Sequence, residues 1–87
     1  DRVAEEDDVV QYFKYNADTG DQSAQVTMGT LYLEGYKVHD IERNDELAQH
    51  YFHMAALDGD TNAIAYLGYM YLKGRGTLAQ NNKTAME

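Results

Sequence analysis

An internal repeat is the feature of this sequence that most restricts its fold. At an offset of 39 residues, segment 9–35 lies over segment 48–74, and ten positions carry identical residues. The pairs are Tyr12 and Tyr51, Phe13 and Phe52, Ala17 and Ala56, Gly20 and Gly59, Asp21 and Asp60, Ala24 and Ala63, Gly29 and Gly68, Tyr32 and Tyr71, Leu33 and Leu72, and Gly35 and Gly74. A period of this length is typical of proteins built from stacked repeat units.

Each unit has the pattern of two helices separated by glycine-terminated turns. Apolar residues recur at helical spacing, which predicts helices over residues 8–18, 22–34, 45–57 and 61–73. Gly20, Gly35, Gly59 and Gly74 follow these segments and are expected to end them. Asp45 is the expected N-cap of the third helix, and a further helix is expected to begin near residue 82.

Two glycines lie inside predicted helices, where glycine costs roughly 0.5–1 kcal/mol relative to alanine. Gly29 and Gly68 occupy the same place in both units. This recurrence predicts that helix backbones approach closely at both positions.

The predicted fold class is all-α, an α-solenoid of stacked antiparallel helix pairs, similar to tetratricopeptide repeats. Residues 1–7 are interpreted as an acidic leader and residues 8–20 as the second helix of a preceding repeat. One repeat is expected over residues 21–59 and a second over residues 60–87, with its last helix truncated.

Composition excludes several function classes. The chain of 87 residues has a net charge of −8 and no cysteine. Binding to nucleic acid requires a basic surface, and zinc fingers, disulfide scaffolds and thiol catalysis require cysteine. No apolar run approaches the roughly 20 residues of a membrane span, so we expect neither a nucleic-acid partner nor direct membrane contact by this segment.

Two short motifs invite a chemical interpretation that their context does not favour. Residues 74–79 fit G-x-G-x-x-A, but a dinucleotide site needs a strand before the glycines, and here a helix is predicted. Glu46, His50 and His53 share one side of a predicted helix, yet nothing else in the sequence completes a metal site. We expect no enzyme activity, no cofactor and no metal.

The tyrosines divide into two groups. Those that recur with the repeat are expected to pack between helices, whereas those that do not recur are candidates for an interface, where tyrosine is enriched. The expected packing residues are Tyr12, Phe13, Ala24, Gly29, Tyr32, Tyr51, Phe52, Ala63, Gly68 and Tyr71. The candidate interface residues are Tyr15, Tyr36, Tyr66 and Tyr69.

The repeat resembles one family. The ladder Ala24-x3-Met28-Gly29-x2-Tyr32-x2-Gly35, continued by Asp45-x2-Ala48-x2-Tyr51-x3-Ala55-Ala56-x2-Gly59, is similar to the Sel-one-like repeat. The second copy adds the family's Gly-x-Gly turn at Gly74 and Gly76. The first copy has Tyr36 and Lys37 in place of that second glycine, and its loop is two residues longer. The resemblance implies a scaffold that binds other proteins.

Within that family, three segments resemble the luminal adaptors of endoplasmic-reticulum-associated degradation: residues 6–12, 20–26 and 80–85. The resemblance implies a location in the lumen of the endoplasmic reticulum and a parent protein anchored in its membrane. It also implies a ubiquitin ligase complex and lectins as partners, and self-association of these repeats as a homodimer. The alternative is a secreted bacterial or protist effector that binds host proteins.

Asn82, Lys83 and Thr84 form an N-x-T sequon. The motif is an acceptor for N-glycosylation in secretory compartments, so Asn82 is a candidate glycosylation site. Chance also produces such a triplet readily in a chain with this many asparagines.

Overall fold

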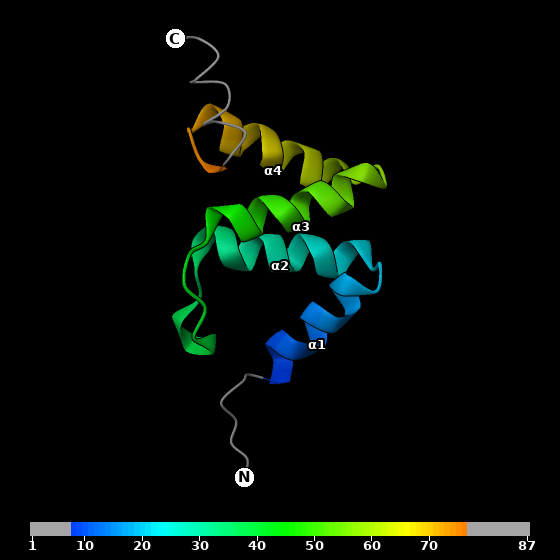
Figure 1. The fold of residues 1–87 in the computed structure, drawn as a ribbon, viewed down its shortest axis with the longest axis vertical. Coiled ribbons are helices and arrows are strands. Elements are labelled where there is room, and N and C mark those ends of the chain that lie inside the picture. The colour runs from blue at the N-terminus through cyan, green and yellow to red at the C-terminus, as the bar shows by residue number, and fades with distance from the viewer. Residues whose placement is uncertain (1–7, 77–87) are drawn as a thin grey trace.

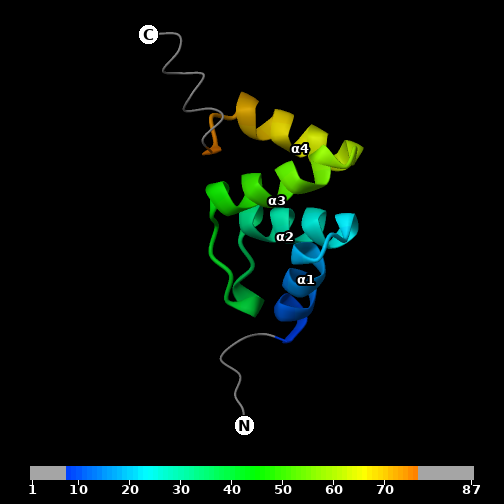
Figure 2. The same cartoon turned by 45° about the vertical axis from the view of Figure 1, so that its right-hand side comes forward.

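The computed structural model describes residues 8–76, and within them the fold is all-α. The helices are α1 (Asp8–Asp18), α2 (Gln22–Glu34), α3 (Asp45–Leu57) and α4 (Thr61–Leu72), with a short 3₁₀ helix, η1, over Lys37–His39. α1 packs against α2, α2 against α3, and α3 against α4. Both ribbon views show α3 lying between α2 and α4 (Figures 1 and 2). Packing between helices that are neighbours in sequence is the arrangement of a solenoid.

The turns that end α1 and α3 share one backbone structure. Gly20 and Gly59 have φ of 111° and 90°, a region that disfavours side chains with a Cβ atom. After α1, the Asp21 N–H donates to the Asn16 carbonyl, and after α3 the Asp60 N–H donates to the Ala55 carbonyl. These bonds satisfy carbonyl groups at the helix ends, so both glycines act as stop signals.

Side-chain caps begin the helices that follow. Asp21 accepts a hydrogen bond from the Ala24 N–H, and Asp60 accepts one from the Ala63 N–H, each at 3.0 Å. At α3 the cap is Asn44, whose side chain accepts from the Leu47 N–H at 3.0 Å.

The expectation that Asp45 caps α3 is therefore wrong by one residue. Asn44 has the extended backbone of a cap residue, with φ of −151° and ψ of 98°, whereas Asp45 is the first helical residue. The Asp45 carboxylate is left free for a tertiary contact.

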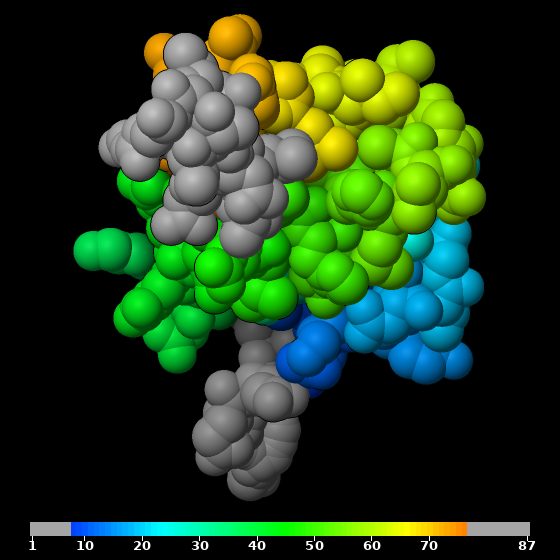
Figure 3. All heavy atoms as spheres, turned by 45° about the horizontal axis from the view of Figure 1, so that its top comes forward, coloured from blue at the N-terminus to red at the C-terminus, as the bar shows by residue number. Residues whose placement is uncertain are grey.

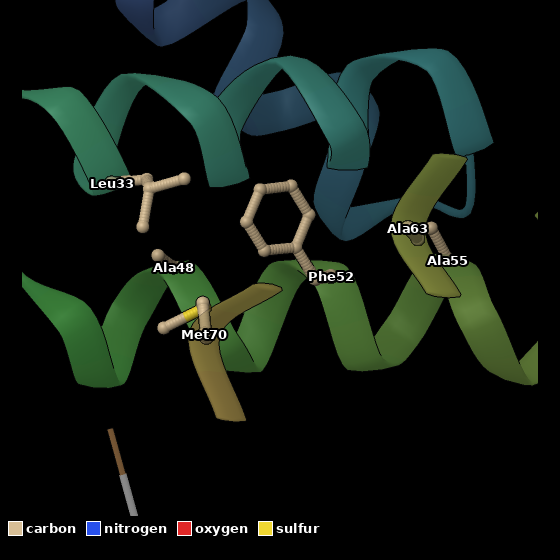
Figure 4. Packing of buried hydrophobic residues seen from close by; sticks show 6 residues of the cluster. All are labelled: Leu33, Ala48, Phe52, Ala55, Ala63 and Met70. Atoms are coloured by element: carbon tan, nitrogen blue, oxygen red, sulfur yellow. The ribbon is translucent and has the colours of Figure 1, made fainter. Parts of the chain in front are cut away.

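The core between α2 and α3 depends on one aromatic ring. Phe52 is fully buried and projects from α3 toward α2, with Leu33 beside it (Figure 4). A Cβ atom added at Gly29 would lie only 2.5 Å from Cε1 of this ring. The absence of a side chain at Gly29 thus makes the space that the ring occupies. Ala48, Ala55, Ala63 and Met70 complete the cluster.

Gly68 does not repeat this contact within residues 8–76. Nothing lies within 4 Å of a Cβ atom added there, and the residue is exposed. The expectation of a close helix contact at Gly68 is not met within residues 8–76, and the helix expected to make that contact, near residue 82, lies outside the described residues. The physical reason is that no described helix covers this face of α4, as α3 covers the corresponding face of α2.

The same reason accounts for two other expected packing residues. Tyr12 on α1 is 65% exposed and Tyr71 on α4 is 42% exposed. Each lies on a helix at one end of the described stack, where the main packing is against a single neighbouring helix. Tyr32 and Phe13 are half-buried, and the remaining expected packing residues are buried: Ala24, Gly29, Tyr51, Phe52 and Ala63.

The connection between α2 and α3 is a small structured loop. Tyr36 and Ile41 exchange both backbone hydrogen bonds, at 2.8 and 3.0 Å, around η1. Asp40 takes a left-handed conformation with φ of 59° to close the turn. Atoms of this loop project from one side of the molecule in the space-filling view (Figure 3). The helix expected near residue 82 lies outside the described residues, as do residues 1–7.

Candidate functional site: a groove between α2 and α4

A groove of about 460 Å³ lies between α2 and α4, the first helices of consecutive repeats. Its lining comes from the C-terminal end of α2 and from one side of α4. The lining residues are Leu33, Glu34, Asn62, Ala65, Tyr66 and Tyr69. We call it the α2–α4 groove. Two of the four candidate interface residues, Tyr66 and Tyr69, lie in it.

Tyr66 and Tyr69 form one side of the groove, the tyrosine wall, which packs on the core beneath it. The Tyr66 ring stacks on the Phe52 ring with a centroid distance of 4.6 Å and an interplanar angle of 8°. Since Phe52 is fully buried, the orientation of Tyr66 is tied to the packing of α3. Tyr69, one turn further along α4, is 43% exposed and carries the Lys73 ammonium 6.0 Å from its ring centroid.

An arginine clamp joins the helix ends near the groove. Arg75, just after α4, places Nε and Nη2 on the carboxylate of Asp45 at distances of 2.8–3.3 Å. Its Nη2 also donates to the Leu33 carbonyl at 2.7 Å. Arg75 thereby joins the end of α2, the start of α3 and the end of α4. The hydrogen bonds to Asp45 raise the pKa of Arg75 above its ordinary value.

A second polar contact lies on the other side of α3, away from the groove. Burial raises the pKa of the Tyr51 hydroxyl to about 12, with a further contribution from the nearby Asp18 carboxylate. The Tyr51 ring stacks on Tyr32 with a centroid distance of 6.1 Å. A hydroxyl that stays neutral and a ring that is packed in this way indicate a structural role for Tyr51, at the junction of α1, α2 and α3, rather than a catalytic one.

The other two candidate interface residues lie elsewhere. Tyr15 is 69% exposed on α1. Tyr36 lines a separate hollow of about 400 Å³ beside the α2–α3 loop, together with Ile41 and Arg43. The structure thus brings Tyr66 and Tyr69 together and leaves Tyr15 and Tyr36 apart.

Sequence reasoning missed the residues that complete the groove, namely Leu33, Glu34, Asn62 and Ala65, and the clamp residue Arg75. The repeat itself holds the signal. At the offset of 39, Asn62, Tyr66, Tyr69 and Lys73 of α4 match Ser23, Thr27, Thr30 and Glu34 of α2. Two of these four positions change from threonine to tyrosine between the repeats, and such a change on one side of a helix indicates a surface with a role of its own.

Other functional features were sought in the described part of the chain. Over residues 8–76, no group of three or more histidine, cysteine or acidic side chains could hold a metal ion. None of the helices described is both long and apolar enough to cross a membrane. The sequon at Asn82 lies outside the described residues.

The Sel1 repeat family matches the chain twice, over residues 22–60 and residues 61–87. The chain belongs to the Sel1 repeat family. The first matched unit contains α2 and α3, so α1 precedes it, and the second begins at the first residue of α4. None of the curated proteins matches the sequence.

Membership of the Sel1 repeat family indicates the general role of this fold. Sel1 repeats mediate contacts between proteins and are generally not enzymes. In this chain, the α2–α4 groove is the place where two consecutive Sel1 repeats present side chains to a common hollow.

Proposed function

We propose that this chain is a non-enzymatic scaffold segment of a luminal adaptor in endoplasmic-reticulum-associated degradation. In that role it links lectins and their substrates to a membrane ubiquitin ligase. The observation that carries the scaffold role is the α2–α4 groove, which has an exposed tyrosine wall supported by a fully buried core ring. Rigid aromatic side chains over a packed base are typical of protein-binding surfaces.

Support for the adaptor role comes from resemblance. Residues 6–12, 20–26 and 80–85 are similar to the luminal adaptors of this degradation pathway, and the third segment includes the sequon at Asn82. A luminal location and a parent protein anchored in the membrane follow from the same resemblance. A secreted effector that binds host proteins is the alternative.

Co-purification of the full-length protein from its own cells tests the role. We expect ubiquitin ligase components and luminal lectins to co-purify with the unaltered protein. Tyr69→Ala should reduce recovery of at least one of these partners, because Tyr69 lines the groove and its loss leaves the core ring in place. Tyr15→Ala, on α1, is the matched control. Recovery of only extracellular host proteins would favour the secreted effector.

N-glycosylation of Asn82 tests the location. The motif Asn82-Lys83-Thr84 is used only when the chain enters the secretory pathway, so we expect a glycan on Asn82 in the parent protein. Peptide mapping with and without glycosidase treatment measures it, and Thr84→Ala should abolish the modification. An unmodified Asn82 in the protein from its native cells would remove the main support that the sequence itself gives for a luminal location.

Self-association is a further part of the proposal. Large apolar side chains are exposed on α1, where Val9 is 50% exposed, and on α4, where Ile64 and Leu72 are 53% and 83% exposed. Covering such side chains gains roughly 1.5–3 kcal/mol each, which favours pairing of two copies. Sedimentation of the chain over micromolar to millimolar concentrations should show a dimer. A monomer throughout that range would contradict self-association by this segment.

A further inference from the structure

We propose that the α2–α4 groove binds an extended peptide segment that places a lysine or arginine side chain between Glu34 and the tyrosine wall. The inference rests on the proposed function of the chain as a protein-binding scaffold, and it names the chemistry of the partner. Its components are a free carboxylate, two tyrosine rings, a side-chain amide and an apolar base.

Glu34 supplies the negative charge. It lies at the last position of α2, is exposed, and makes no ion pair with any residue of the range 8–76. The guanidinium groups of Arg75 and Arg43 both approach Asp45 instead, at 2.8 and 3.8 Å. The whole chain has a net charge of −8, so a basic partner is also favoured at long range.

The tyrosines supply faces that attract a cation. One face of the Tyr66 ring lies on Phe52, which leaves its other face for the groove. The Tyr69 ring already has an ammonium group, that of Lys73, 6.0 Å from its centroid. Since Tyr69 already has this cation of the chain itself, Tyr66 is the ring left for a cation of the partner. A second cation held between a ring and Glu34 would combine a cation–π contact with an ion pair.

The remaining lining suits the rest of a peptide. Ala65 is exposed in the groove and offers apolar surface to the aliphatic stem of a lysine or arginine. Asn62 is exposed at the groove, and its side-chain amide has both a donor and an acceptor for a peptide backbone. A hollow of about 460 Å³ holds a few side chains rather than a folded domain. An extended segment is therefore the occupant that matches both size and chemistry.

Titration of the isotopically labelled 87-residue chain with two short peptides tests the proposal. The probes are acetyl-GLRLG-amide and acetyl-GLQLG-amide, which differ only in the charged side chain. We expect amide shifts at the end of α2 and along α4 with the first peptide. The second peptide should bind about threefold to tenfold more weakly, because it lacks both the exposed ion pair and the cation–π contact that the arginine makes.

Variants of the protein assign the effect to Glu34. Glu34→Gln should weaken binding of the arginine peptide by about twofold to fivefold, the part due to the ion pair, because the cation–π contact with the tyrosines remains. Binding of the glutamine peptide should be unchanged, because that peptide makes no ion pair with Glu34. Glu46→Gln, which removes another exposed acid, from the first turn of α3, should change neither affinity. Both variants alter exposed side chains, so the fold is expected to persist.

Three results would overturn the proposal. The first is equal binding of the two peptides, and the second is an unaltered preference in Glu34→Gln. The third is the detection, in the free protein, of proton contacts between the groove tyrosines and residues 77–87, which would show that the chain fills its own groove. None of these results would contradict the scaffold role, which co-purification tests separately.

Discussion

Gly29→Ala is expected to destabilise the fold by about 2 to 3 kcal/mol, although alanine is the better helix former. The added Cβ would lie 2.5–2.8 Å from three carbon atoms of the Phe52 ring. That ring is fully buried and stacks on Tyr66, so it has no free space into which to turn. The clash must be relieved by separating α2 from α3.

Gly68→Ala is the matched control. It occupies the same position of the next repeat, but an added Cβ there meets nothing within 4 Å. The change should leave stability unaltered or raise it by about 0.5–1 kcal/mol through helix propensity.

Thermal melts followed by circular dichroism compare the two variants. The melting temperature of Gly29→Ala should fall by about 10–20 °C, since 1 kcal/mol corresponds to several degrees in a domain of this size. An equal fall in Gly68→Ala would mean that Gly68 is also closely packed, against residues outside the range 8–76.

Arg75→Leu has the second largest expected effect, a loss of about 2 kcal/mol. The substitution leaves the Asp45 carboxylate, whose side chain is 26% exposed, without its close ion pair. It also removes the hydrogen bond to the Leu33 carbonyl at 2.7 Å. Arg75→Lys should recover only part of the loss, because an ammonium group cannot reproduce the paired N–H geometry of a guanidinium.

Arg43→Leu is the control for charge alone. Arg43 also approaches Asp45, at 3.8 Å, but its side chain is 60% exposed, so its loss should cost less than about 0.5 kcal/mol. Urea unfolding of Arg75→Leu, Arg43→Leu and Asp45→Asn, and of each arginine variant combined with Asp45→Asn, would measure the coupling energy between each arginine and Asp45. Equal destabilisation by Arg43→Leu and Arg75→Leu would contradict the clamp.

Local signals predicted the helices well. The bounds expected for α1, α2 and α3 agree with the structure, and α4 ends one residue earlier than expected, at Leu72. These bounds depend on apolar spacing, on turn glycines and on acidic cap residues, all of which act within a few residues of the chain. The N-cap of α3 was missed because Asn44 and Asp45 are both good cap residues, and only the backbone conformation decides between them.

The candidate site was predicted only in part. Tyr66 and Tyr69 were singled out because they do not recur, and they do lie in the groove. Glu34 was not singled out, because one acid among the 15 of this chain forms no motif in the sequence. Its place opposite α4 depends on how α3 spaces the two helices.

The sequence by itself determined the repeat, the all-α class, the helix bounds and the Sel1 family, because each follows from periodicity and from short-range backbone preferences. The tertiary structure alone decided that Gly29 packs against the Phe52 ring and that Glu34 is the acid that lines the groove. It also brought Arg75 onto Asp45 and the Leu33 carbonyl, which lie 30 and 42 residues earlier. Such contacts depend on the neighbours that each helix face meets, and residues that match in the repeat can meet different neighbours.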